Sequence, residues 1–291
     1  MINPFADDSA ATDSDDRELV RLAKGGNRDA LDRLIRRHQG WVYNIVVRML
    51  YWSADAEDVT QEILIKVITK LSTFEQRSSF RTWLYRIAVN HVLNTARSRV
   101  EGWHFARYEA ALDATPDVDI VDPSPGADWE VVHEETKLSC TSGMLLCFDR
   151  RQRLVYILGE LFGVSDVVGA ELMEISRENF RQLLTRARRD LYSFMNNKCG
   201  LVNTANPCRC AKKTKGFIDA GYVDPKNLVF LQPRSRQVRE LTRPTYEGLE
   251  KLDIAYGELF RKHPFYESRD FVDSLRSLIT EPQFKSILES T

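Results

Sequence analysis

The chain has little cysteine for its length, almost no net charge, and no apolar stretch long enough to cross a membrane. Five cysteines in 291 residues do not suit a disulfide-stabilised secreted domain, and they favour a reducing compartment, the cytoplasm. Residues 1–16 are rich in aspartate and lack the apolar centre of a signal peptide, so we expect a disordered lead-in there. Without an apolar run of membrane-spanning length, no membrane insertion is expected.

The common catalytic motifs are absent as well. The sequence has no Walker loop, no GxSxG and no HExxH, and its histidines show no metal-ligand spacing. We therefore expect no enzyme, and no cofactor that the function requires.

A net charge of −1 gives no overall basic signature for nucleic acid, so any DNA binding needs a segregated charge. The charge is segregated, because no lysine or arginine lies between Arg107 and Lys137, whereas both flanks are basic. The acidic stretch also holds the turn-forming cluster DPSPG at 122–126. We interpret 101–137 as a mobile linker between two folded units, and a solvated spacer is the plainer alternative.

The N-terminal part has the periodicity of helices, with a break at Gly25 and Gly26. Ser53 is predicted to cap a helix whose apolar stripe is Val59, Ile63, Val67 and Leu71. Another face of that helix carries Asp55, Asp58 and Glu62. Such a carboxylate stripe is either a solvated surface or a docking face for a basic partner.

The next helix, within SSFRTWLYRIAVNHVLN (Ser78–Asn94), mixes aromatic and basic residues. Its spacing directs Leu84, Ala88 and Val92 inward and leaves more exposed faces to Arg81, Tyr85, Arg86 and Asn90. Arginines beside aromatic rings can hold phosphates and stack unpaired bases. Trp83 is equally consistent with a base-stacking role and with a place in the core.

These residues carry a family resemblance. DAEDVTQEILIKVITKLSTFEQRSSFRTWLYRIAVNHVLN (Asp55–Asn94) resembles region two of bacterial sigma factors of the extracytoplasmic-function (ECF) type, a likeness that extends over 17–100. The resemblance implies that Asp55, Asp58, Gln61 and Glu62 bind the clamp helices of the largest subunit of core RNA polymerase. It also implies a reader of the melted minus-ten strand. The residues implied in that reader are Phe74, Glu75, Gln76, Arg77, Ser79, Phe80, Arg81, Trp83, Tyr85, Arg86 and Asn90.

A second basic unit, at 138–198, has a helix-turn-helix pattern. DRRQRLVYILGELFG (Asp149–Gly163) predicts an amphipathic helix that ends at Gly163; Ser165 and Ser176 are predicted N-caps of the two helices that follow. Glu174 occupies the turn position that glycine often holds. SRENFRQLLTRARRDL is similar to sigma region four, which implies contacts to the minus-thirty-five element and to the polymerase flap. The implied DNA contacts are Ser176, Arg177, Glu178, Asn179, Arg181, Gln182, Thr185, Arg186 and Arg188.

Residues 199–291 are left unexplained by the two sigma regions. Two further helices are predicted, one around Leu249–Leu259 and one around Phe271–Leu278. We expect this extension to pack against one of the DNA- or polymerase-binding domains, of which the domain that bears Cys140 and Cys147 is the nearest, and to regulate the sigma regions in cis. Docking either masks a binding face, which is the simpler switch, or holds the domain in its active pose. A structural zinc bound by Cys140, Cys199, Cys208 and Cys210 is one hypothesis, and inert buried thiols are the other.

The sequence therefore predicts an all-α protein that binds core RNA polymerase and promoter DNA, and an anti-sigma factor is a further possible partner. Two alternatives stay open. One is a helix-turn-helix regulator that needs no polymerase, and the other is a metal or redox sensor that acts through its cysteines.

Overall fold

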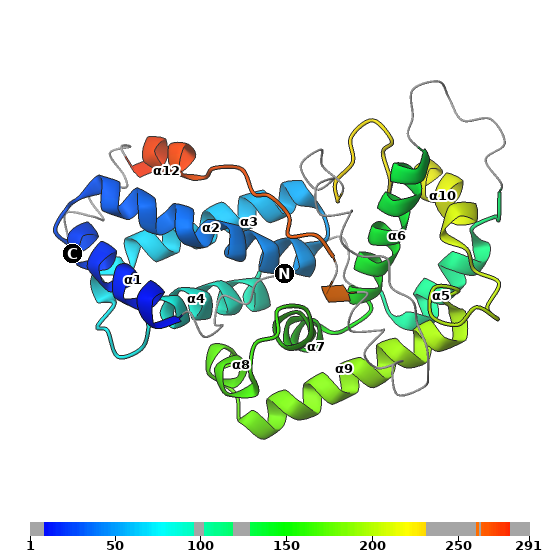
Figure 1. The fold of residues 1–291 in the computed structure, drawn as a ribbon, viewed down its shortest axis with the longest axis horizontal. Coiled ribbons are helices and arrows are strands. Elements are labelled where there is room, and N and C mark those ends of the chain that lie inside the picture. Colours follow the sequence, from blue (N-terminus) through cyan, green and yellow to red (C-terminus); the bar gives the residue numbers. More distant parts are fainter. Residues whose placement is uncertain (1–8, 96–101, 119–128, 231–259, 262, 280–291) are drawn as a thin grey trace. The chain divides into compact units, whose positions relative to one another are not determined.

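The computed structural model describes residues 9–95, 102–118, 129–230, 260–261 and 263–279, and their regular elements are all helical (Figure 1). Within these residues the only extended pairing is an isolated bridge between Cys199 and Cys208. The predicted all-α fold class is confirmed.

The chain divides into two compact units that do not follow the boundaries predicted from the sequence. The first, which we call the N-terminal unit, contains residues 2–98, 157–181 and 265–291; the central unit contains residues 99–156 and 182–264. The elements of the N-terminal unit are α1 (Ser9–Lys24), α2 (Arg28–Leu50), α3 (Ser53–Thr69), η1 (Leu71–Thr73), α4 (Phe80–Asn94), the π-helical turn η2 (Ile157–Leu161), α8 (Asp166–Met173), the start of α9 (Arg177–Lys198) and α12 (Val272–Ile279). Those of the central unit are α5 (Phe105–Ala114), α6 (Trp129–Leu145), α7 (Arg150–Tyr156), the rest of α9, and α10 (Cys210–Asp219).

Helix α1 begins at Ser9, so the prediction of a disordered lead-in over 1–16 is wrong for its second half. The cause is Asp16, which is 1% exposed. Its carboxylate accepts a hydrogen bond from Arg37 at 2.9 Å and lies 3.0 Å from Nε2 of His38. Buried charges are tolerated when they are paired in this way, and both partners lie on α2, beyond the reach of local sequence reasoning.

The helices around the predicted acidic face form as the sequence indicates. After the turn at Gly25 and Gly26, the side chain of Asn27 caps α2 by accepting from the N–H of Ala30 at 3.0 Å. Helix α3 starts at Ser53 itself, with Trp52 as its N-cap residue, so the predicted cap is one residue too late. The apolar stripe of α3 is buried throughout, and the opposite carboxylates therefore face outward.

The acidic segment is more ordered than a mobile linker over 101–137 would be. It contains α5 and the first half of α6, whereas residues 119–128 lie outside the described residues. Leu112 of α5 and Val131, Val132 and Leu138 of α6 are buried. The prediction rested on the acidic composition of the segment and overlooked its few apolar residues, which are enough to pack two helices.

The helix-turn-helix forms with the predicted caps. Ser165 accepts from the N–H of Val168 and Ser176 accepts from the N–H of Asn179, at 3.3 and 3.1 Å. Glu174 adopts a left-handed conformation with φ 53°, which costs a non-glycine residue about 1 kcal/mol. The preceding helix is shorter than predicted, because α7 ends at Tyr156 and the chain continues as a π-helical turn.

The C-terminal extension follows the prediction only in part. The helix predicted around Leu249–Leu259 lies outside the described residues, and α12 is the second predicted helix. Phe260 and His263 contact Tyr156 and Thr141 of the central unit, as expected. Residues 265–279 belong to the N-terminal unit and pack on α2, so the extension is not confined to the domain that bears Cys140 and Cys147.

Candidate functional sites

The first candidate site is the acidic face of α3. Asp58 and Glu62 are exposed, and Asp55 and Gln61 are half-buried, as their position opposite the apolar stripe requires. A carboxylate oxygen of Glu62 lies 3.1 Å from Nε2 of His91 on α4. The face therefore presents carboxylates from one helix to solvent, which is the geometry of a docking surface for a basic partner.

The second candidate site is the loop between η1 and α4. Glu75, Gln76 and Arg77 are all exposed, and Arg77 pairs with Glu75 at 2.6 Å. Gln76 has φ 57°, a left-handed conformation that non-glycine residues seldom adopt. Ser79 caps α4 by accepting from the N–H of Thr82 at 3.1 Å. The loop thus offers three polar side chains at the start of a well-anchored helix.

Four of the residues implied in minus-ten reading are core residues instead. Phe74, Phe80, Arg81 and Tyr85 are 3%, 1%, 6% and 1% exposed. The expectation that Arg81 and Tyr85 lie on exposed faces is therefore wrong. Its cause is α1, which covers this side of α4 and supplies Asp13 as the 2.7 Å partner of Arg81. Burial also raises the pKa of the Tyr85 phenol far above its usual range.

Three other residues of α4 remain accessible. Trp83 is half-buried, with its ring tilted against Phe74 at a centroid distance of 5.3 Å, so it packs against the core on one side while a base-stacking role stays a prediction. Asn90 is half-buried. Arg86 forms an ion pair with Glu171 of α8 at 3.2 Å, and α8 packs on α4 within the same unit.

The start of α9 presents a row of polar side chains to solvent. The exposed members of the predicted set are Ser176, Arg177, Glu178, Asn179, Arg181, Gln182, Thr185 and Arg186. Arg188 is half-buried. Gly169 on α8 allows α9 to pack closely against α8. A Cβ at position 169 would lie 2.4 Å from the ring of Phe180 on α9, so a larger residue would push the two helices apart. The helix can therefore enter a groove with its first two turns, as recognition helices do.

An aspartate that the sequence analysis missed holds two of these arginines. Asp166, at the start of α8, pairs with Arg181 at 2.5 Å and with Arg177 at 3.3 Å. The hydrogen bond from Arg181 is the main reason that the pKa of Asp166 is lowered. The sequence does offer one indication of this role. Asp166 directly follows the Ser165 cap, and carboxylates are favoured at helix N-termini.

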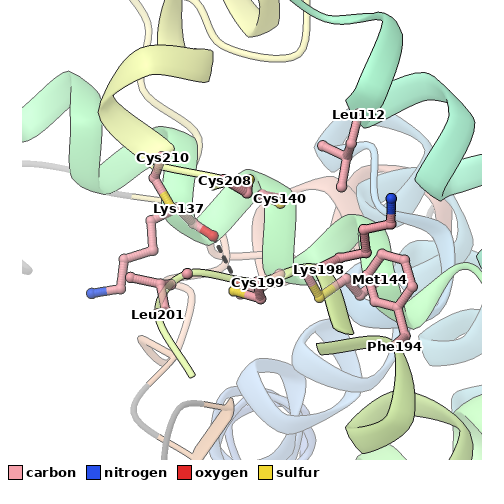
Figure 2. Close-up of a pocket in the computed structure, with 12 residues that line it drawn as sticks. Leu112, Lys137, Cys140, Met144, Phe194, Lys198, Cys199, Leu201, Cys208 and Cys210 are labelled. Carbon is pink, nitrogen blue, oxygen red and sulfur yellow. Dashed lines mark hydrogen bonds between the residues drawn. The ribbon is translucent and has the colours of Figure 1, made fainter. Parts of the chain in front are cut away.

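The four cysteines of the zinc hypothesis line one cavity (Figure 2). Cys140 comes from α6, Cys199 follows α9, and Cys208 and Cys210 lie at the start of α10. Burial raises the pKa of all four thiols, that of Cys210 to about 12, which is unlike the lowered pKa of reactive cysteines. Within the described ranges, no three His, Cys, Asp or Glu side chains are grouped as metal ligands. Zinc binding therefore stays a prediction.

No helix among the described residues is long and apolar enough to span a bilayer.

The chain resembles known sigma factors in sequence. The sequence pattern of the family described as Sigma-70 region 2 matches residues 34–101. The RNA polymerase sigma-H factor of Pseudomonas aeruginosa is 38% identical over 90 residues, which are 30% of this chain and 47% of the relative. The ECF RNA polymerase sigma-E factor of Escherichia coli is 30% identical over 186 residues, which are 60% of this chain and 90% of the relative. A solved structure, described as CnrH in complex with the cytosolic domain of CnrY, gives a TM-score of 0.44 at 21% identity and covers 62% of this chain and 97% of that chain.

The region-two match falls on the segment from within α2 to the end of α4, where the acidic face and the exposed loop lie. The likeness to sigma-E continues far beyond it and spans 90% of that relative. The chain therefore belongs to the sigma-70 family of RNA polymerase sigma factors, in its ECF type.

Proposed function

We propose that the protein is a transcription initiation factor that docks on core RNA polymerase through α3 and places it on specific promoters. The observation that carries the proposal is the carboxylate face of α3, on which Asp58 and Glu62 are exposed and Asp55 is half-buried, set opposite a buried apolar stripe. A solvated acidic face on a rigid helix attracts a basic helical partner with little change in its own structure. The protein has no catalytic role of its own in this proposal.

Promoter reading is divided between two segments, the start of α9 and the loop that precedes α4. The start of α9 reads the duplex minus-thirty-five element, because its arginines are spaced along the exposed side of a recognition helix. The melted minus-ten strand meets Glu75, Gln76 and Arg77, and the half-buried Trp83 supplies a ring for base stacking. Phe74, Phe80, Arg81 and Tyr85 support this surface from beneath rather than touch DNA.

A helix-turn-helix regulator that acts without polymerase is the competing reading, and it leaves the acidic face of α3 without a role. The test is run-off transcription and binding with purified core polymerase, comparing Asp58→Lys with Glu18→Lys. Both variants reverse one exposed carboxylate, but Glu18 lies on α1 and pairs with Arg21. We expect Asp58→Lys to lose at least tenfold in core affinity, about 1.4 kcal/mol, and Glu18→Lys to keep it. Equal affinity for core in all three proteins, or none in the wild type, would overturn the proposal.

A structural zinc in the cysteine cavity is a second, separate proposal. It is supported by the convergence of four thiols from three segments on one cavity (Figure 2), and it requires their side chains to close on the ion. The metal content of the purified protein tests it. We expect about one zinc per chain, lost in Cys208→Ser and kept in Cys147→Ser, because Cys147 does not line the cavity. The interaction with an anti-sigma factor stays a prediction.

A further inference from the structure

The C-terminal strap, which we define as residues 265–279, is attached to the N-terminal unit by its main chain. The side-chain amide of Asn44 on α2 donates to the carbonyl of Tyr266 at 2.8 Å and accepts from the N–H of Tyr266 at 2.9 Å. Asn44 is fully buried, so these two bonds are shielded from water. Further along, Gln39 accepts from the N–H of Phe271 at 3.0 Å. Two amide side chains of α2 thus form hydrogen bonds with the backbone of the strap, as the main chain of a neighbouring β-strand would.

Apolar side chains secure the same segment. Phe271 is 0% exposed, and Val272 and Leu275 are 2% exposed. The guanidinium carbon of Arg48 lies 4.5 Å from the centroid of the Tyr266 ring, over its face. The strap is therefore a packed part of the unit rather than a loosely adhering tail.

Arg269 extends from this anchored segment to α3. Its Nη2 donates to Oε1 of Gln61 at 2.9 Å, and its Nε lies 3.4 Å from a carboxylate oxygen of Glu57. The guanidinium also stacks over Phe271 at 5.0 Å, which fixes its direction. Gln61 is one of the four residues implied in polymerase binding, and Glu57 adjoins Asp58 in the sequence. A basic group of the chain itself thus occupies part of the surface that a basic partner needs.

We propose that the strap competes with core RNA polymerase for α3, so that Arg269 must leave Glu57 and Gln61 before the polymerase can dock there. The inference rests on the proposed function and adds an internal regulator to it. The contact involves exposed groups, since Arg269 is 43% and Glu57 35% exposed. It is therefore weak enough to exchange with a larger basic surface. The apparent affinity for core polymerase is then the intrinsic affinity multiplied by the fraction of molecules in which Arg269 has left Glu57 and Gln61.

The test uses the full-length protein and core polymerase. Arg269→Ala should raise core affinity about two- to fivefold, the range that removal of an exposed ion pair produces. Arg276→Ala is the matched control, because it removes the same charge from the same strap while its partners Asp32 and Asp29 lie on α2. The control should change core affinity by less than the Arg269 variant does.

Hydrogen exchange supplies the second measurement. The amides of Tyr266 and Phe271 should exchange faster when core polymerase is bound, because the loss of the Arg269 contacts to Glu57 and Gln61 removes one attachment of the strap and makes its local opening easier. Unchanged affinity of Arg269→Ala, equal gains in both variants, or stronger protection of these amides in the complex would overturn the inference. If no variant binds core at all, the proposed function fails instead, so the two failures are distinguishable.

Discussion

At the scale of single residues, Asp16 shows how one buried carboxylate joins two helices. Burial alone would raise its pKa, but the hydrogen bonds and charges of His38 and Arg37 outweigh that effect and lower it. A carboxylate whose pKa is lower in the folded than in the unfolded protein stabilises the fold while it is ionised. Its contribution is present above the unfolded pKa of about 3.9 and is lost as the pH falls through the lower folded value.

We expect Asp16→Ala to lower the free energy of unfolding at pH 7 by about 3 kcal/mol, because it leaves the buried His38 and part of Arg37 unpaired. Asp15→Ala is the control, since Asp15 pairs with the same Arg37 but is 65% exposed, and it should cost less than about 1 kcal/mol. Urea denaturation at several pH values measures both. The stability of the Asp16 variant should also fall less than that of the wild type below about pH 4. Equal losses in the two variants would contradict this account.

At the scale of elements, α9 separates two kinds of arginine along one helix. Arg181 is exposed in the first turns, where a recognition helix meets base edges, whereas Arg188 is half-buried two turns later. Arg181 is held by Asp166, so the proposed promoter reading requires that this ion pair be exchanged for a contact to DNA.

Arg181→Ala should therefore cost about 1–3 kcal/mol on the preferred upstream element and much less on altered sequences. Arg188→Ala should weaken binding evenly across sequences and reduce the salt dependence of binding by about one phosphate contact. Fluorescence titrations of the protein with core polymerase on a set of upstream elements, at several salt concentrations, measure both effects. If the two variants lose the same affinity on every element, the division into base readers and phosphate anchors is wrong.

The elements also show what the sequence can and cannot predict. The helix-turn-helix and α3 were predictable because their caps and apolar stripes are local, as Ser165, Ser176 and the stripe from Val59 to Leu71 illustrate. The first half of α1 was not, because the partners of Asp16 lie on another helix. That single error had a second consequence, since α1 covers the side of α4 on which Arg81 was expected to be exposed. Helix α5 and the first half of α6 were missed because acidic composition was taken as evidence for a linker.

At the scale of the whole molecule, the extension is built into both units. Glu135 of α6 is buried and accepts from the N–H groups of Val229 and Phe230 at 2.7 and 2.9 Å. Lys213 of α10 donates to the carbonyl of Leu112 on α5 at 2.9 Å. Residues up to Phe230 are thus part of the folded central unit, whereas the strap belongs to the N-terminal unit.

Two truncations should therefore behave differently. A chain that ends before Phe217 should lose the cooperative unfolding of the central unit, because it removes two hydrogen bonds of the buried Glu135 and a buried phenylalanine, at a cost of about 3–5 kcal/mol. A chain that ends at Pro264 should keep that transition. Thermal unfolding followed by circular dichroism and calorimetry measures both. A normal transition in the shorter chain would show that 217–230 is dispensable for folding.

The way in which Asn44 holds Tyr266 has a consequence for how this protein can change over generations. The side-chain amide of Asn44 forms hydrogen bonds with the backbone N–H and C=O of residue 266, which every amino acid except proline provides. These two hydrogen bonds therefore do not depend on the side chain at position 266, and only proline removes the N–H that one of them needs. The exposed side chain at position 269, which meets α3, can change without loss of the hydrogen bonds and the buried apolar side chains that hold the strap on α2. Mutations at position 269 can then strengthen or weaken the competition with core polymerase, while the strap keeps its place on α2.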